Sequence, residues 1–290
     1  MIAEDGFEQI NEAKAEMGHI YNQPDPRAYF RELKGLGYSI PDEAKPVFKR
    51  LIGHLRRRRN EDTVHVLDLG CSYGVNAALL KHDLAMPDLY RHWEQDHSKD
   101  ASPQEVAEID HRYFANLDEP EDIEVIGLDQ AENAVFFAEE IGLLDEALAV
   151  NLETGTLPKP SEDELAAVDL VTSTGCVGYV TEKSFERLLP AVTPGRPPWM
   201  ANFVLRMFPF DTIEQTLREH GYATEKLENR TFVQRRFASP EEREQVLDHL
   251  ADHGVDPTGK ETEGYLLAEF YLSRPTSEVN GATVDRLVFG

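Results

Sequence analysis

From residue 60 onward, short apolar stretches rich in β-branched residues alternate with longer segments whose apolar positions recur at helical spacing. This alternation is typical of a parallel sheet covered by helices on both faces. Seven segments have the strand pattern: 64–69, 123–129, 147–151, 168–173, 199–206, 231–237 and 265–273. Between the last two, the chain offers one helix and a polar linker but no packed crossover, so we expect an antiparallel final strand. The pattern predicts a doubly wound, seven-stranded α/β fold.

Helical periodicity fills the intervals between these strands. The expected helices cover 74–82, 131–141, 181–192, 211–220 and 240–252. Thr181, Asp211 and Ser239 are residue types that cap helix N-termini, and Gly142 and Gly221 are typical of helix ends. These start and stop signals support the predicted helix boundaries.

The N-terminal residues 1–59 lie outside this core and read as three helices, broken at 23–26 and at 35–41. They enter just before the first strand and are free to fold over either edge of the sheet. We therefore expect a helical lid over a main domain that covers residues 60–290.

A second addition, residues 83–120, interrupts the main domain with helical patterns at 88–96 and 103–116. The helix after the first strand returns to the sheet edge opposite the ligand crevice. We therefore expect this insertion to lie away from the crevice and to serve packing or oligomerisation, with a homodimer as the candidate assembly.

Composition narrows the function classes. The net charge of −25 disfavours a nucleic-acid partner, because phosphate backbones would be repelled. The basic run Arg56–Arg59 is better explained as the end of a helix, where cations complement the macrodipole. No apolar run approaches the roughly 20 residues of a membrane span, the N-terminus is acidic rather than signal-like, and two cysteines are too few for a disulfide framework. We expect a soluble, cytoplasmic protein without a membrane partner.

The segment Val66–Leu80, VLDLGCSYGVNAALL, has the pattern of a ligand-binding turn. A strand that contains Asp68 leads into a turn with Gly70, Ser72 and Gly74 and then into a helix, which places backbone N–H groups at a helix N-terminus. The dinucleotide fingerprint G-x-G-x-x-G would need glycines at positions 70, 72 and 75, and the second and third of these positions hold serine and valine. That fingerprint is absent.

The same segment resembles the S-adenosylmethionine (SAM) binding motif D-x-G-x-G-x-G of class I methyltransferases, which have a Rossmann-like fold. Asp68, Gly70 and Gly74 match the motif, and Ser72 replaces its middle glycine with another small residue. The predicted strand order over residues 60–273 is also similar to that of the family. The resemblance implies SAM as cofactor and transfer of its methyl group to a small molecule.

The resemblance also implies roles for residues at the strand ends. Asp68 and the loop backbone would hold the methionine moiety of SAM. Asp129, with Gln130 beside it, would bind the two ribose hydroxyls, and Asn151 with Leu152 would contact adenine. The alternatives are a helix cap at Asp129 and a plain turn at Asn151.

The reaction is expected beyond the fourth strand, in residues 173–179. Thr174 would face the cofactor there, and the ring of Tyr179 would face the sulfonium through a cation–π contact or else pack on the N-terminal helices. Arg206, at the end of the fifth strand, would hold a ligand carboxylate, or alternatively form a surface ion pair. Tyr29 and Tyr38 would close the lid over the methionine end, or only pack there.

Two further clusters are weaker candidates. Cys71 and Cys176 are expected at neighbouring strand ends, but neither has an adjacent histidine to activate a catalytic thiol. His92, Asp96 and His97 supply only two ligands on one helix face, so a solvated helix face is expected rather than a metal site.

The segment after the fourth strand lacks two sequence features that would indicate a particular type of methylation or a general base. It contains no N-P-P-Y or D-P-P-Y sequence, which marks amide and exocyclic-amine methylation in the family, and no His, Asp or Glu before Glu182. A nucleophile that needs no general base would require only positioning. We therefore expect a methyltransferase acting on an amine, hydroxyl or carboxylate. The alternatives are a SAM cyclase of the azetidine-2-carboxylate synthase type, which releases methylthioadenosine, and a non-catalytic SAM-binding protein.

Overall fold

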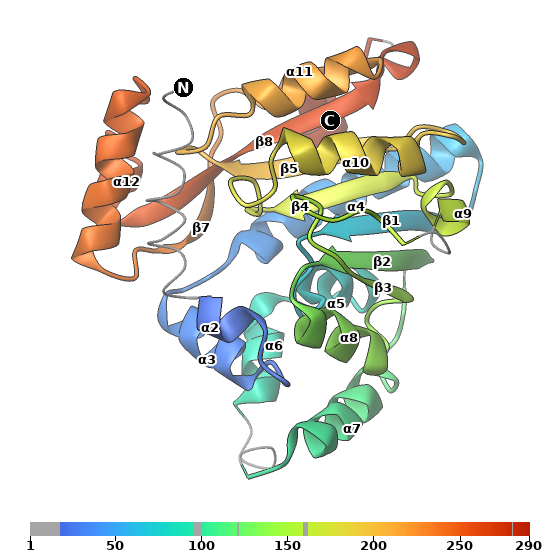
Figure 1. Cartoon of the computed structure of the whole chain (residues 1–290), viewed down its shortest axis with the longest axis vertical. Helices are drawn as coiled ribbons and strands as arrows, with labels where there is room; N and C mark the ends of the chain where they lie inside the picture. Colours follow the sequence, from blue (N-terminus) through green and yellow to red (C-terminus); the bar gives the residue numbers. More distant parts are fainter. Residues whose placement is uncertain (1–17, 95–99, 121, 159–161, 280) are drawn as a thin grey trace.

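The computed structural model describes residues 18–94, 100–120, 122–158, 162–279 and 281–290. Within these residues one sheet holds eight strands: β1 (Val64–Leu69), β2 (Ile123–Asp129), β3 (Glu146–Ala149), β4 (Leu170–Thr174), β5 (Trp199–Leu205), β6 (Tyr222–Lys226), β7 (Phe232–Arg236) and β8 (Tyr265–Pro275). The strand order is β3-β2-β1-β4-β5-β8-β6, and β7 also pairs with β8 (Figure 1). Strands β1 to β5 are parallel, and β8 runs antiparallel to β5.

The predicted fold class and the reversed final strand are confirmed. The number of strands is eight rather than seven, because β6 (Tyr222–Lys226) was missed. Only Tyr222 is buried in this strand, and the other residues are partly exposed. Its sequence YATEK therefore lacks the apolar run or alternation by which a strand is recognised.

Helices cover the sheet as the alternation predicts. Those described are α2 (Gly18–Tyr21), α3 (Arg27–Gly35), α4 (Ile40–Arg59), α5 (Val75–Lys81), α6 (Met86–Trp93), α7 (Pro103–Phe114), α8 (Glu132–Glu140), α9 (Glu162–Leu165), α10 (Glu182–Val192), α11 (Asp211–Glu219), α12 (Pro240–Asp252) and α13 (Val284–Phe289). Helices α10 and α11 pack together, and α4 packs with α5 (Figure 1).

Most predicted helix ends agree with the structure. The hydroxyls of Thr181 and Ser239 accept hydrogen bonds from the first turns of α10 and α12. Gly142 and Gly221 follow α8 and α11 with φ angles of +82° and +83°. The cap predicted at Asp211 is wrong: this residue is the first residue of α11, and Phe210 occupies the cap position without a side-chain hydrogen bond.

The insertion packs on the N-terminal helices. Trp93 of α6 stacks on Phe30 of α3 with ring centroids 3.8 Å apart, and the Tyr90 hydroxyl donates to the Tyr38 carbonyl at 2.8 Å. The Arg27 guanidinium donates to the Ala101 carbonyl at 2.9 Å. The insertion thus supports the segment that carries Tyr29 and Tyr38.

The solvated face expected at His92 is wrong. His92 is buried, and its Nε2 lies 2.7 Å from Oδ1 of Asp110 on α7, while Trp93 Nε1 donates to Oδ2 at 3.0 Å. Helix α7 covers this face of α6, so the histidine joins two helices. Asp96 and His97 lie outside the described residues.

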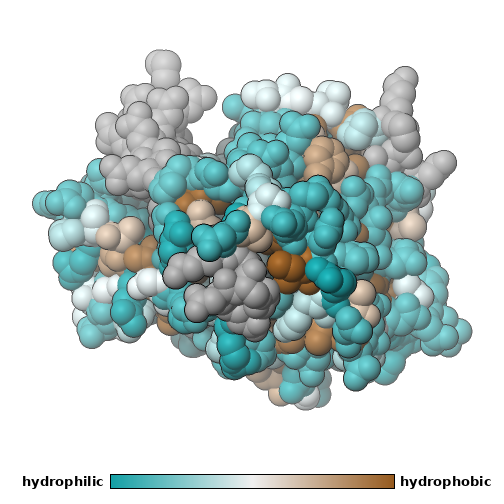
Figure 2. Space-filling model, turned by 90° about the horizontal axis from the view of Figure 1, so that it is seen from below, coloured by the Kyte–Doolittle hydropathy of each residue, from teal (hydrophilic) through white to brown (hydrophobic). Residues whose placement is uncertain are grey.

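The basic run ends α4, as predicted, and Asn60 closes the helix in the left-handed conformation. Arg56 donates to the carbonyls of Asp62 and Asp122, and Arg58 and Arg59 form ion pairs within the molecule. Most of the face in Figure 2 is hydrophilic, in keeping with 54 acidic and 29 basic residues. Within the described ranges, no helix has the length and apolarity to cross a membrane.

Candidate functional site

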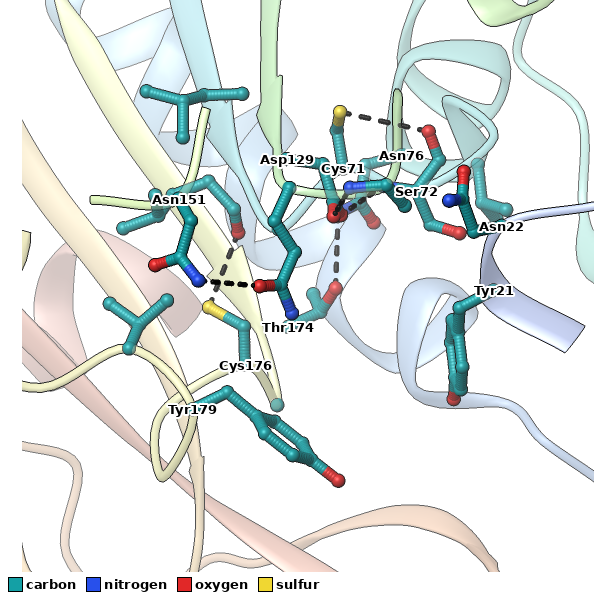
Figure 3. A pocket seen from close by; sticks show the side chains of 18 of the residues that line it. Tyr21, Asn22, Cys71, Ser72, Asn76, Asp129, Asn151, Thr174, Cys176 and Tyr179 are labelled. Carbon is teal, nitrogen blue, oxygen red and sulfur yellow. Dashed lines mark hydrogen bonds between the residues drawn. The ribbon is translucent and has the colours of Figure 1, made fainter. Parts of the chain in front are cut away.

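A cavity of about 540 Å³ opens at the carboxyl ends of β1, β2 and β4. Its wall combines the turn after β1, the ends of β2 and β4, the turn after β3, and residues of the N-terminal helices and β7 (Figure 3). This is the edge of a doubly wound sheet at which ligands bind. The volume lies within the range of small-molecule sites.

The turn after β1 forms one wall of this cavity. Gly70 (φ +75°) and Ser72 (φ +48°) both line it, and a Cβ at Gly70 would lie 2.7 Å from the Cβ of Cys176. The Ser72 hydroxyl is buried and has no hydrogen-bond partner among the residues that the structure describes. Gly74 is not part of the wall. A Cβ there would lie 3.1 Å from Ala138, so this glycine lets the turn before α5 approach α8 closely.

Asp129 ends β2 and joins this turn. Its Oδ2 accepts from the Ser72 N–H at 2.9 Å, and its Oδ1 accepts from the Ala131 N–H at 2.9 Å (Figure 3). The cap position of α8 belongs to Ala131, so Asp129 forms a turn before the helix rather than the cap itself. Burial raises the pKa of this carboxyl. Each oxygen has one backbone partner and faces the cavity with its remaining lone pairs.

Asp68 lies behind the cavity wall rather than in it. Its side chain is 1% exposed, and its oxygens accept from Asn76 Nδ2 at 3.0 and 3.2 Å and from the Thr172 hydroxyl at 2.9 Å. Burial raises the pKa of this carboxyl to about 7. Asn76 also donates to the Thr174 hydroxyl at 3.1 Å, and these two residues line the cavity. The structure thus places Asn76, which the sequence did not single out, where Asp68 was expected.

The turn after β3 forms the far end. Strand β3 ends at Ala149, so Asn151 and Leu152 lie in a turn rather than on the strand as predicted. The Asn151 amide donates to Gln130 Oε1 at 2.8 Å, and its Oδ1 accepts from the Glu153 N–H at 2.8 Å. Leu152 is buried and lines the cavity beside these polar groups. This end offers an apolar surface with a polar edge.

Tyrosines form another part of the wall. Tyr21, Tyr29, Tyr38 and Tyr179 line the cavity, and the rings of Tyr29 and Tyr38 pack edge to face with centroids 6.4 Å apart. Desolvation raises the pKa of each phenol above its ordinary value near 10. Close to neutral pH these hydroxyls are therefore protonated donors and not bases. Tyr21 was not expected from the sequence.

Arg206 is a predicted site residue that lies outside the cavity, as Asp68 and Gly74 do. It does not line the wall, and its guanidinium bonds to Glu261 and, at 3.0 Å, to the Asp256 carbonyl. The residue is buried, so the ion pair is internal rather than on the surface. Its partner follows 55 residues later, beyond the reach of a local pattern.

The two cysteines line the cavity from neighbouring strand ends, as predicted. Cys71 donates to the Ser72 carbonyl at 3.7 Å and Cys176 to the Leu69 carbonyl at 3.3 Å. Burial raises the pKa of the Cys71 thiol well above its ordinary value. No histidine lies among the described wall residues, so nothing there activates a thiol.

Strand β7 adds two residues that the sequence did not indicate, Gln234 and Arg235. Both Arg235 terminal nitrogens donate to Glu242, at 2.9 and 2.6 Å. Across the parts of the chain that the structure describes, no three His, Cys, Asp or Glu side chains are grouped as metal ligands.

No family model matches the chain, and no curated protein matches it. Among solved structures, the plantazolicin methyltransferase BamL, in complex with a triazolic desmethylPZN analog and SAH, is 13% identical with a TM-score of 0.45 over 93% of this chain and 97% of that chain. The cyclase SpnF is 15% identical with a TM-score of 0.38 over 78% and 80%. The magnesium protoporphyrin IX methyltransferase ChlM of Synechocystis, with bound SAM, is 12% identical with a TM-score of 0.34 over 77% and 76%.

Proposed function

We propose that the chain is a SAM-dependent enzyme that transfers the methyl group of SAM to a small molecule. The observation that carries this proposal is the link between Asp129 at the end of β2 and Ser72 in the glycine turn after β1. It brings a two-oxygen acceptor and the glycine turn to the wall of one cavity of about 540 Å³. The unpartnered Ser72 hydroxyl adds a polar group that a ligand would satisfy.

The nucleoside would occupy the β2 and β3 side. A ribose diol donates two hydrogen bonds, and each Asp129 oxygen keeps acceptor capacity after its one backbone bond. Adenine would lie on Leu152, with the Asn151 and Gln130 amides at its polar edge. Both amides are already bonded to each other, which gives this edge a defined orientation.

The methionine moiety would meet Asn76 and Thr174, with Asp68 behind them. Asn76 donates hydrogen bonds to Asp68 and to Thr174. A ligand ammonium beside Thr174 would therefore be attracted by the buried Asp68 carboxylate without contacting it. Tyr29 and Tyr38 would cover this end as parts of the N-terminal lid, over the main domain from residue 60.

SAM supplies a methyl group activated by a sulfonium, and the protein positions the acceptor relative to that methyl group. Tyr179 follows β4 and would face the sulfonium with its ring, a contact worth ~2 kcal/mol when desolvated. With the phenols protonated, none of the described residues at this end of the cavity is placed to remove a proton before attack. The proposed acceptor therefore attacks with a lone pair that is already free, and alignment provides the acceleration.

A cyclisation of the azetidine-2-carboxylate synthase type is the second candidate. In that reaction the amine of SAM attacks its own side chain and methylthioadenosine leaves. The observation that favours it is that the N-terminal segment lines the cavity with Tyr21, Tyr29 and Tyr38, which leaves less room for a second substrate beside SAM.

Calorimetric titration with SAM and with S-adenosylhomocysteine (SAH) tests the cofactor assignment. Asp129→Ala should weaken SAM at least tenfold, ~1.4 kcal/mol, because the ribose loses its acceptor. Asp211→Ala, at the start of α11, is the matched control and should bind normally. No binding by the unaltered protein would refute the assignment, and equal affinity in both variants would refute the role of Asp129.

Incubation with SAM alone, followed by mass spectrometry, separates the reactions. Methylthioadenosine with a cyclic amino acid indicates the cyclase. Stable bound SAM that yields SAH only when small-molecule acceptors are added indicates the methyltransferase. SAM that stays unchanged with every acceptor would support a non-catalytic SAM-binding protein instead.

A further inference from the structure

Strand β7 contains a β-bulge that turns one glutamine into the cavity. Val233 pairs with Leu267 of β8 and Arg235 pairs with Leu266, so Gln234 has no partner residue on β8. Successive side chains of a regular strand point to opposite faces, yet Gln234 and Arg235 both line the cavity. A bulge re-aims a side chain in this way, and bulges are frequent beside active sites.

The Gln234 amide has an unmet hydrogen-bonding capacity. The residue is 7% exposed, and its backbone carbonyl accepts from the Ser39 N–H at 2.8 Å. Its side-chain amide, however, has no hydrogen bond to any residue that the structure describes. A ligand group that meets this amide in the cavity would form a hydrogen bond that the described residues leave open. The amide therefore faces the cavity with an acceptor and donors available.

Glycine at the end of β4 makes room for this amide. Gly175 follows β4 with φ +82°, and a Cβ there would collide with Gln234 Nε2. Gly175 lies between Thr174 and Cys176, which also line the cavity. Gln234 is thus held beside the strand end at which the sulfonium is placed under the proposed function.

The charged residues around the cavity limit the kind of acceptor that can bind beside Gln234. The charged side chains in the described wall are Asp129, Glu153 and Arg235. Arg235 is held by Glu242 through both terminal nitrogens, and Glu153 accepts from Thr181. An anionic acceptor would be buried without a cation of its own, which is costly. A neutral group that becomes positive during reaction fits this wall better.

We propose that Gln234 positions the nucleophile and that this nucleophile is an uncharged amine. The proposal rests on the proposed function and names its acceptor class. Gln234 Oε1 accepts one N–H of the amine, which directs the nitrogen lone pair toward the methyl group. The N–C bond forms as the C–S bond breaks with its electron pair going to sulfur, and the new ammonium then releases a proton to water. Tyr21 and Tyr179 line the same cavity (Figure 3), and their rings tolerate the developing positive charge.

Two cofactor analogues test the proposal without knowledge of the acceptor. SAH lacks the transferred methyl group, whereas sinefungin carries an amino group at that position. Gln234→Leu should weaken sinefungin by about tenfold or more and SAH by less than about twofold, because only sinefungin loses a hydrogen bond. Gln234→Glu should tighten sinefungin by at least about threefold, since a carboxylate adds charge attraction. Gln215→Leu, an exposed glutamine on α11, should change neither affinity.

Equal weakening of both analogues in Gln234→Leu, or no change in either, would overturn the proposal while leaving SAM binding intact. Failure of the unaltered protein to bind both analogues would instead refute the proposed function. The amine belongs to a separate acceptor, because the step forms a bond to the methyl carbon of SAM. Methylthioadenosine formed from SAM alone would mean that the amine of SAM attacks its own side chain instead, and this outcome would overturn methyl transfer and this proposal together.

Discussion

The Tyr73 hydroxyl attaches the N-terminal helices to the cofactor turn, and its removal should loosen the lid. Tyr73 lies in the turn after β1 and is 1% exposed. Its oxygen accepts from the Gln23 N–H at 2.9 Å and donates to the Gln23 carbonyl at 2.9 Å. Tyr73→Phe keeps the ring, which packs on Tyr29 at 5.4 Å between centroids, and removes both hydrogen bonds.

Two hydrogen bonds at ~1 kcal/mol each give a loss of about 2 kcal/mol, or a factor of about thirty in the opening equilibrium of this segment. Hydrogen exchange of the backbone amides in residues 20–35 measures that equilibrium. Protection should fall about thirtyfold in Tyr73→Phe, and SAM should bind more weakly because Tyr29 covers the cavity less often. Tyr113→Phe, in the insertion, is the matched control. Unchanged protection in Tyr73→Phe, or an equal loss in the control, would refute this account of the lid.

Further predictions concern residues behind the cavity wall. Burial raises the pKa of Asp68 to about 7, so this carboxyl is largely protonated at pH ~6, and a nearby ligand ammonium favours its charged form. SAM affinity measured by calorimetry should therefore rise between pH ~6 and ~8, and Asp68→Asn should abolish the rise; a rise that persists in the variant would contradict this assignment. Gly74→Ala should lower the unfolding free energy by ~1–3 kcal/mol in denaturant titration, because φ is +71° and the new Cβ would meet Ala138 at 3.1 Å; a change within ~0.5 kcal/mol would show that α5 can shift. Arg206→Met should cost ~3–5 kcal/mol in thermal or denaturant unfolding, since it leaves Glu261 buried without its partner. The folded Arg206→Met protein should bind SAM normally. A selective loss of SAM binding would show that Arg206 contributes to the site after all.

Sequence patterns determined the parts of the fold that depend on local order. Strand β1 is almost wholly buried, and its near-continuous apolar run VHVLDL is typical of a central parallel strand. The turn that follows, and Asp129 at the end of β2, could be placed together because parallel strands bring their carboxyl ends to one edge. Gly142 and Gly221 could be predicted as helix ends because a left-handed residue is a local requirement.

Tertiary structure alone decided which side chains reach the cavity. Asp68 and Asn76 are close in sequence, but the packing of α5 on the sheet puts the carboxylate behind and the amide in front. Gln234 reaches the wall through a bulge that exists only because β7 pairs with the reversed strand β8. The Arg206 side chain lies outside the cavity because it pairs with Glu261, which comes from a distant segment of the chain. Residue type and period specify an element and its ends, whereas the direction of a side chain depends on neighbours that only the folded chain brings together.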